Sequence, residues 1–341
     1  MTTMTFAPEI PNQLVRFDAF GAPSELNAVT EPIPEPGRGE VRIRVEASSV
    51  QFTDTLIRRR LYPDLRERPP LTPGYDLVGV VDAVGPGVER WREGDRVADL
   101  TVVGGNARFA IRPAAGLVAV PPSVDAARAT TLVLSWVTAY QCLHRAARAQ
   151  PGERLLVIGG NGAVGQALIA LGVRAGLEVW ATAREHHHPA LEAAGARPLP
   201  RDGWEAIVRE AGGVDVVVDG VAAEGFGPSH RALRRGGRLI GIGATAAAQK
   251  ASMAKAVRDF IGLYLRKLVP GKSVRVYSIT KERTAHPEAF AEDLGVLFGL
   301  LERGEIDPGV AERLTLAEVA DAHTRLERGG LRGKLVVEPW S

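Results

Sequence analysis

The chain has 341 residues, 45% of them hydrophobic, and carries 42 basic and 40 acidic residues for a formal net charge of +2. This length predicts two domains with full cores, and the balance of charge excludes the strongly basic surface of a nucleic-acid-binding protein. The single cysteine, Cys142, excludes an intrachain disulfide and a cysteine-rich zinc lobe. Residues 1–5 lack signal-peptide features, and no apolar run approaches a membrane span. We expect a cytoplasmic protein that is not held in a membrane.

The first 120 residues predict a small all-β unit. Short strand-like runs alternate with turns rich in Pro, Gly and Asn, and these runs lie at residues 14–17, 41–45, 79–84, 96–99 and 107–111. Pro121 and Pro122 then end the unit. Ser123 or Asp125 can cap a helix that the pattern predicts over residues 126–148. A domain boundary is expected near residue 125.

Residues 154–184 carry the most informative motif of the chain. A short apolar run at 155–158 is followed by Gly160, Gly162 and Gly165, which form G-x-G-x-x-G at the start of an Ala/Leu-rich helix. In a dinucleotide site the first glycine permits a tight turn, the second lets the backbone approach the pyrophosphate, and the third lets helix and strand pack closely. A second strand at 177–181 and apolar runs at 214–219 and 238–243 supply the βαβ context that a lone motif lacks. The sequence therefore predicts a Rossmann domain.

The residues after the second strand decide between NAD and NADP. NAD sites place an acidic residue about 20 positions after the motif, whereas NADP sites place a cation near the 2′-phosphate. Arg184 occupies this position, and Glu185 follows one residue too late to clamp a ribose. His187 is a further candidate donor, although the histidines at 186–188 also fit a solvated helix start before Pro189. NADPH is the expected cofactor.

Several motifs resemble one family, the zinc-independent medium-chain dehydrogenase/reductases of the quinone oxidoreductase and enoyl reductase group. The resemblance covers nearly the whole chain and rests on residues 51–55 with 61–63, 73–81 with 84–85, 94–97, 138–140, the glycine motif, and 322–323 with 333–334. It implies an α/β fold with two domains, a GroES-like mainly-β catalytic domain from residues 1–125 and 282–341 and a Rossmann domain with a doubly wound parallel sheet from 126–281. It also implies that nicotinamide meets substrate in a cleft between the domains.

The same resemblance addresses zinc. The ligand positions of the zinc-dependent relatives are similar to Gln51, Tyr75 and Leu134 in this chain, and none of these residue types binds zinc well. Cys142 lies one helical turn beyond Thr138 and is expected to be a small buried hydrophobe. Without a Lewis acid, hydride from C4 of NADPH has to add to an acceptor that is already electron-poor, such as a quinone or an α,β-unsaturated carbonyl.

The resemblance also names the candidate site residues. Tyr62 is a candidate proton donor or substrate contact, with an aromatic plug in a Tyr-Pro turn as the other interpretation. Gln51 replaces the usual Asn and Leu56 the frequent Tyr, so the substrate pocket is expected to be atypical. Thr138 is similar to the nicotinamide contact, with a helix-internal back-bonding threonine as the alternative. The full expected set is Tyr62 and Gln51 for catalysis, and Thr138, Gly160, Gly162, Ala163, Val164, Gly165, Arg184, His187, Gly243 and Lys334 for the cofactor.

We therefore expect an NADPH-dependent, zinc-independent reductase of a quinone or conjugated carbonyl. Two alternatives stay open: a redox-neutral or inactive NADP-binding relative in a biosynthetic pathway, suggested by Gln51 and Leu56, and a membrane-associated binding protein, suggested by residues 247–272. Residues 273–279 are expected to form the last strand of the Rossmann sheet and to pair with a second copy in a homodimer, unless residues 247–272 cover that edge. Helices are expected at 287–303 and 316–327.

Overall fold

The computed structural model describes residues 10–242, 261–262, 265–266, 269–331 and 333–341. The chain forms two compact units, one from residues 1–134 and 294–341 and the other from 135–293. The expected domain boundaries, after residues 125 and 281, thus lie before those of the structure, which fall after residues 134 and 293. Helix α2 (Ala126–Thr131) explains the first difference, because it packs on strands β3, β4 and β15 of the first unit.

The first unit is built on a seven-stranded sheet in the order β14-β15-β3-β4-β5-β7, with β6 paired to β3. The central strand β3 is long, and its alternating residues Val41, Ile43 and Val45 are fully buried in the core of the sheet. A separate antiparallel pair, β1 and β2, lies beside it. The strands are β1 (Asn12–Arg16), β2 (Asn27–Glu31), β3 (Glu40–Val50), β4 (Leu77–Val84), β5 (Arg96–Asp99), β6 (Phe109–Pro113), β7 (Val118–Ala119), β14 (Val310–Leu314) and β15 (Lys334–Val337).

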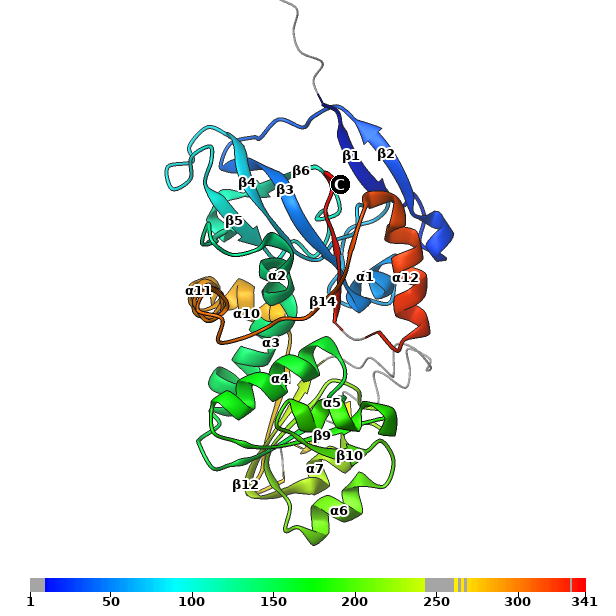
Figure 1. Cartoon of the computed structure of the whole chain (residues 1–341), viewed down its shortest axis with the longest axis vertical. Helices are drawn as coiled ribbons and strands as arrows, with labels where there is room; N and C mark the ends of the chain where they lie inside the picture. The colour runs from blue at the N-terminus through cyan, green and yellow to red at the C-terminus, as the bar shows by residue number, and fades with distance from the viewer. Residues whose placement is uncertain (1–9, 243–260, 263–264, 267–268, 332) are drawn as a thin grey trace, which may run out of the picture. The chain divides into compact units, whose positions relative to one another are not determined.

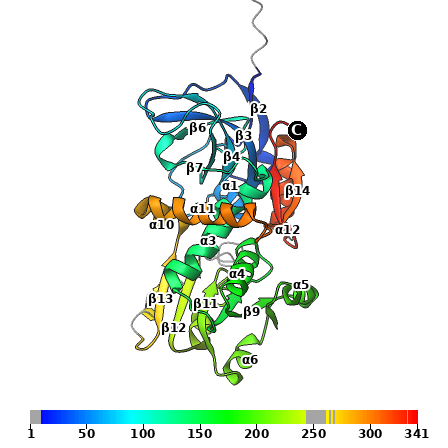
Figure 2. The same ribbon diagram turned by 60° about the vertical axis from the view of Figure 1, so that its left-hand side comes forward.

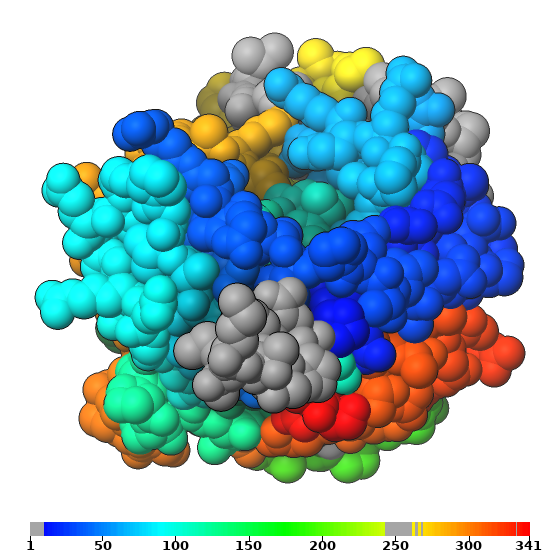
Figure 3. Space-filling view, turned by 90° about the horizontal axis from the view of Figure 1, so that it is seen from above, coloured from blue at the N-terminus to red at the C-terminus, as the bar shows by residue number. Residues whose placement is uncertain are grey.

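Both ends of the chain contribute to this unit, as the resemblance implied. Strand β15 pairs antiparallel with β3, and the Trp340 indole donates to the Val45 carbonyl at 2.8 Å. Figure 3 shows the red C-terminal residues beside the blue N-terminal strands. Helix α12 (Val319–Arg328) packs against α1 (Phe52–Arg58).

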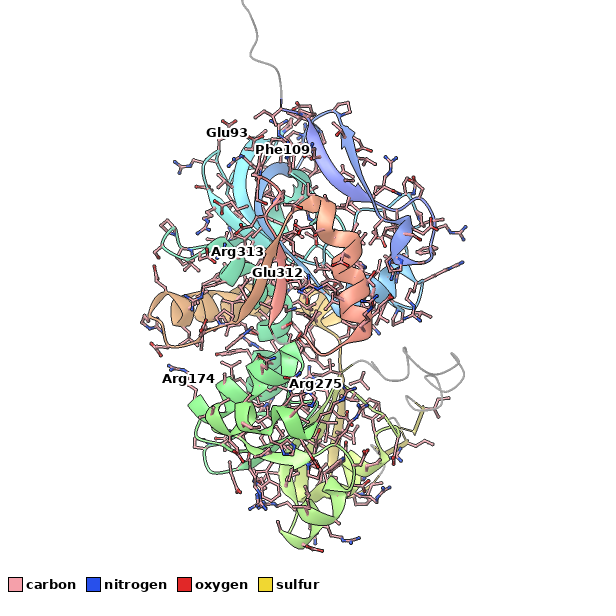
Figure 4. The ribbon with its side chains drawn as sticks, turned by 45° about the vertical axis from the view of Figure 1, so that its right-hand side comes forward. Glu93, Phe109, Arg174, Arg275, Glu312 and Arg313 are labelled. Atoms are coloured by element: carbon pink, nitrogen blue, oxygen red, sulfur yellow. The ribbon has the colours of Figure 1, made fainter. Side chains whose placement is uncertain are left out.

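Strand β14 ties the C-terminal segment to its neighbours through charged side chains on both of its faces. Glu312 and Arg313, labelled in Figure 4, occupy consecutive positions and so point to opposite faces. Glu312 accepts from Arg325 of α12, while Arg313 binds Asp125, which is the cap of α2, and Glu338.

The second unit contains a six-stranded, all-parallel sheet in the order β10-β9-β8-β11-β12-β13. Numbered along the unit, this order is 3-2-1-4-5-6, the order of a doubly wound dinucleotide-binding fold. The predicted α/β fold class with a Rossmann domain is confirmed. The strands are β8 (Arg154–Ile158), β9 (Glu178–Ala183), β10 (Arg197–Pro200), β11 (Val214–Asp219), β12 (Leu233–Ile242) and β13 (Ser273–Tyr277). Figure 2 shows β13 beyond β12 at the edge of this sheet.

The remaining helices precede, connect and follow these strands along the chain. The expected helix over 126–148 is present as α2, α3 (Val137–Tyr140) and two π-helical stretches (Leu132–Trp136 and Gln141–Ala147). The others are α4 (Ala163–Arg174), α5 (His188–Ala193), α6 (Trp204–Glu210), α7 (Gly227–Ala232), α10 (Ile279–Ala285) and α11 (Pro287–Glu302). Across the described ranges, no helix is long and apolar enough to cross a membrane.

Candidate active site

The turn between β8 and α4 has the geometry of a dinucleotide-binding loop. A Cβ added at Gly165 would lie 2.2 Å from the Gly159 carbonyl oxygen, so only glycine allows this close approach of helix to turn. A Cβ at Gly160 would lie 2.8 Å from the Cβ of Ala181. The sharp bend itself falls at Gly159, with φ +90°, and not at Gly160 as the motif predicted. The glycine before the motif therefore makes the turn, and Gly160 serves close packing.

The turn is anchored to the neighbouring strand β9 by Thr182. The Gly159 N–H donates to the Thr182 hydroxyl at 3.0 Å, and the Gly160 N–H donates to its carbonyl at 2.9 Å. A Cβ at Gly162 would meet only the Gly159 carbonyl oxygen, at 3.4 Å, so the backbone before α4 is open to an incoming group. Ala163 and Val164 begin α4, whose first N–H groups point toward this opening. The residues therefore fit the pyrophosphate of a dinucleotide.

Arg184 and three histidines follow the end of β9. Arg184 directly follows the strand, is exposed, and precedes a 3₁₀ turn at Glu185–His187. His187 stacks on His186, with ring centroids 3.9 Å apart, and His188 contacts the Ala183 carbonyl. Arg184 therefore directly follows the strand whose end binds the adenosine ribose in this fold, and Glu185 is the next residue.

Thr138 lies on α3 and belongs to a buried polar chain that reaches the sheet edge. Its side chain is hydrogen-bonded to the hydroxyl of Tyr277 on β13, which itself donates to the Gln141 side-chain oxygen at 2.7 Å. Gln141 in turn donates to Asp293, which accepts three hydrogen bonds from the Arg145 guanidinium. The hydrogen bond with Tyr277 therefore fixes the Thr138 side chain and links it to strand β13.

The first unit contains a second polar cluster, built around Asp76 at the start of β4. Its carboxylate accepts from the Ser49 hydroxyl at 2.6 Å, the Thr130 hydroxyl at 3.0 Å and the Gln51 amide at 2.7 Å. The Lys334 ammonium donates to the side-chain oxygen of Gln51. Gln51 and Lys334, which are 283 positions apart, are thus brought into direct contact.

Burial controls the charges of this cluster. Burial lowers the pKa of Lys334 to about 8, against the pull of Asp76 and Asp54, so the amine stays mainly cationic at neutral pH. Burial raises the pKa of Asp54 to about 7, although the backbone N–H groups of Gln51 and Gly74 favour its carboxylate. Burial raises the pKa of Asp76 as well. Lys334 is therefore the local countercharge of two buried acids.

These residues do not fit a zinc ion. The Gln51 oxygen is already taken by the Lys334 ammonium, whose positive charge would repel a second cation. Tyr75, at the second ligand position, is fully buried with its hydroxyl bonded to Tyr62. Cys142 is a buried free thiol whose pKa burial raises, as expected for a structural cysteine. Over the ranges that the structure covers, no cluster of three or more His, Cys, Asp or Glu side chains could hold a metal.

The two tyrosines form a hydroxyl pair. The hydroxyl oxygens of Tyr62 and Tyr75 are 2.5 Å apart, and their rings meet edge to face with centroids 5.8 Å apart. Tyr62 is half-buried, whereas Tyr75 is 1% exposed. Burial raises the pKa of Tyr75 far above its usual value, so its hydroxyl keeps its proton. Tyr62 is thus hydrogen-bonded to a hydroxyl that stays protonated.

The expected residues fall into separate groups. Gln51 and Lys334 share one network in the first unit, where both side chains are more than nine-tenths buried. The glycine loop, Arg184, His187 and Thr138 belong to the second unit, and Gly243 lies outside the described residues. The sequence argument missed Asp76, Ser49, Thr130 and Tyr277. Asp76 could have been noticed in the sequence, because an acidic residue directly before the apolar strand β4 is unusual. The sequence around the other three residues gives no such indication.

Comparisons with known proteins agree with this geometry. Residues 37–122 match the alcohol dehydrogenase GroES-like domain, and residues 200–337 match a family described as zinc-binding dehydrogenase. The quinone oxidoreductase of Rattus norvegicus is 30% identical over 336 residues, covering 95% of this chain and 96% of that protein.

Solved structures show the same likeness. A mycobacterial protein solved as a complex with NADPH has a TM-score of 0.81 at 30% identity, covering 96% of this chain and all of that chain. The CurK enoyl reductase has a TM-score of 0.81 at 25% identity, covering 96% and 99%. The chain therefore belongs to the medium-chain dehydrogenase/reductase superfamily, in the branch of the quinone oxidoreductases and enoyl reductases.

Proposed function

We propose that this protein is an NADPH-dependent reductase of a quinone or an α,β-unsaturated carbonyl and that it works without a metal ion. The observation that carries the proposal is the Lys334–Gln51–Asp76 network, because it fills the zinc-ligand position with an internal cation and its partners. A carbonyl in this enzyme is polarised by hydrogen-bond donors alone. Hydride addition is then limited to acceptors that conjugation has already made electron-poor.

NADPH, when bound, supplies a hydride from C4 of its nicotinamide ring. Around it, the glycine loop and the first turn of α4 hold the pyrophosphate, and Arg184 pairs with the 2′-phosphate. Thr138 offers its hydroxyl oxygen as a contact for the carboxamide, held in place by Tyr277. Two relatives support the cofactor and the substrate class: the mycobacterial NADPH complex and the rat quinone oxidoreductase.

Tyr62 is the proton donor in this proposal. Addition of hydride to the β-carbon of a conjugated carbonyl leaves an enolate that requires one proton. Tyr62 is half-buried in the loop after α1, and its hydroxyl is the atom that Tyr75 supports. Gln51 and Lys334 do not contact the substrate in this proposal, because their polar atoms are hydrogen-bonded within the buried network.

A redox-neutral role is the second candidate, and one observation favours it. Gln51 uses both polar atoms of its side chain inside the protein and is 4% exposed, so the amide at this position does not serve a substrate. Leu56 adds no polar group. The membrane-associated alternative rests on residues 247–272, most of which lie outside the described residues.

A screen of NADPH oxidation by chelator-treated protein separates these functions. The acceptors are simple quinones, enones and enoyl thioesters, each with a no-acceptor control. We expect steady NADPH consumption with at least one acceptor and no loss of rate after exhaustive chelation. NADPH binding without consumption across the panel would favour the redox-neutral role, and a rate that depends on added zinc would contradict the metal-free mechanism.

A further inference from the structure

Tyr62 and Tyr75 lie at the two ends of the loop that joins α1 to β4. Their hydroxyl oxygens are 2.5 Å apart, within hydrogen-bond distance, and either can donate to the other. The environments differ: Tyr75 is 1% exposed and lies two residues before the start of β4, whereas Tyr62 is half-buried. Tyr75 is therefore the inner hydroxyl of the pair and Tyr62 the outer one.

The inner hydroxyl cannot readily give up its proton. A phenolate at position 75 would be desolvated and would lie near the carboxylates of Asp54 and Asp64, and both effects disfavour a negative charge. Whenever Tyr62 carries a negative charge, Tyr75 must therefore be the donor in the pair. A hydrogen bond from a neutral donor to an ion is stronger than one between neutral groups.

We infer that Tyr75 is a positioning residue for proton transfer, which orients the Tyr62 hydroxyl and stabilises the phenolate that Tyr62 forms when it protonates the reduced substrate. The inference rests on the proposed reductase function. With NADPH as reductant, hydride bonds to the β-carbon of the conjugated carbonyl and an enolate results. The Tyr62 O–H bond then breaks, its proton bonds to the enolate, and the phenolate on Tyr62 keeps the hydrogen bond from Tyr75. Water returns the proton, so one acceptor and one proton are consumed for each NADPH.

Packing alone gives a different expectation for the same pair. The two rings meet edge to face, at an interplanar angle of 90°, and this contact needs no hydroxyl. Phenylalanine at position 75 keeps the ring and removes only the oxygen. Tyr75→Phe therefore removes the hydrogen bond to Tyr62 and keeps the ring contact that packs the loop.

The first test reads ionisation directly and needs neither substrate nor cofactor. Tyrosinate absorbance is followed through an alkaline titration of the wild-type chain, Tyr62→Phe, Tyr75→Phe and the double variant. The difference between Tyr75→Phe and the double variant isolates Tyr62 without its donor, and we expect it to develop at a higher pH than the corresponding wild-type difference. Equal pH values for the two differences would overturn the inference, whatever the enzyme reduces.

The second test uses the acceptor that the wild-type chain reduces. We expect Tyr75→Phe to lower kcat about tenfold to a hundredfold with little change in KM, and to move the alkaline limb of the kcat profile to higher pH. Tyr75→Phe should cost nothing further in the Tyr62→Phe background, because the effect passes through Tyr62. An equal loss in both backgrounds overturns the inference and assigns Tyr75 a structural role.

NADPH affinity and thermal midpoint are measured for each variant, and 3-fluorotyrosine at position 75 serves as a second, ring-preserving substitution. Its hydroxyl is a stronger donor, so we expect the alkaline limb to shift to lower pH. A wild-type chain that reduces no acceptor overturns the proposed function, whereas an active wild type with an unchanged Tyr75→Phe profile overturns only the role of Tyr75.

Discussion

Arg184 is the residue on which cofactor choice depends. It is exposed at the carboxyl end of β9, where the ribose of a dinucleotide is bound in this fold, and it is the N-cap of the 3₁₀ turn that begins at Glu185. Arg184→Ala should weaken NADPH binding about tenfold or more and leave NADH binding nearly unchanged, because a charge-assisted phosphate contact is worth about 1.5–3 kcal/mol. Titration of protein fluorescence or calorimetry with each cofactor measures both affinities.

Arg209→Ala is the matched control for this prediction. Arg209 is an exposed arginine on α6 of the same unit, and its removal changes the net charge by the same amount. We expect NADPH affinity to be unchanged in this variant. Equal losses of NADPH and NADH in Arg184→Ala would refute the 2′-phosphate assignment.

Single residues were predictable where a motif prescribes their surroundings. The glycines and Arg184 belong to a strand, turn and helix whose geometry is local, so the motif located this loop, although the sharp bend falls at Gly159 and not at Gly160. Gln51 and Lys334 were named for different roles, and only the pairing of β15 with β3 brings them together. Tyr75 was considered for its inability to bind zinc, but its contact with Tyr62 depends on how the intervening loop folds. Contacts between distant segments leave no periodic trace in the sequence.

At the scale of elements, the described sheet of the second unit ends in β10 on one side and in β13 on the other. Strand β13 is paired only with β12. Val274 and Tyr277 are buried against opposite faces of the sheet, so the strand is fixed in place while its outer edge carries no proline. An edge of this kind is a template for pairing, and we expect a homodimer in which β13 continues the sheet into a second copy.

Two proline variants test this pairing. Consecutive residues of a strand direct their N–H groups to opposite edges, so of Arg275→Pro and Val276→Pro one removes an outward N–H and the other an N–H that faces β12. We expect one variant to become monomeric with its thermal midpoint retained and the other to lose stability. Light scattering gives the mass, and a monomeric wild-type chain at micromolar concentration would rule out the paired edge.

The elements that the sequence missed share a physical cause. Strand β2 has no buried residue, so no alternation marks it, and β10 contains Pro198 and Pro200, which strands tolerate only at a sheet edge. The helix over 126–148 was expected as a continuous α-helix, but π-helical stretches interrupt it on both sides of Thr138. Buried strands such as β3 and β11 were located because burial itself creates the apolar pattern.

At the scale of the whole molecule, acid stability should depend on His323. Its ring, on α12, is fully buried with neither nitrogen hydrogen-bonded, and burial beside Arg58 lowers its pKa to about 3. Because the pKa in the folded state lies below the ordinary 6.5, the unfolded chain binds the proton first. The contribution of His323 is complete above about pH 6.5 and is lost as the pH falls toward 3, by up to about 1.4 kcal/mol per pH unit.

The titration of Asp54 changes the free energy of unfolding in the opposite direction, so the effect of His323 has to be measured as a difference between two proteins. Its pKa is raised to about 7 in the folded state, so protonation between pH 7 and 4 stabilises the fold. Comparison of His323→Gln with the wild type cancels this effect. We expect the free energy of unfolding of the variant to fall less steeply between pH 6.5 and 4.5, and His286→Gln, at an exposed position, is the control for the loss of a histidine. Parallel curves for His323→Gln and the wild type would show that His323 is not held neutral.

The central claim is that this chain passes hydride from NADPH to a conjugated acceptor without a metal ion. The most direct measurement incubates metal-free protein, checked by elemental analysis, with NADPH deuterated at C4 on one face or the other and with an enone, and follows the label by mass spectrometry. The account predicts one deuterium on the β-carbon of the saturated product from one of the two labelled cofactors, at a rate unaffected by chelation. Product without label from either cofactor, or turnover that appears only when zinc is restored, would contradict it.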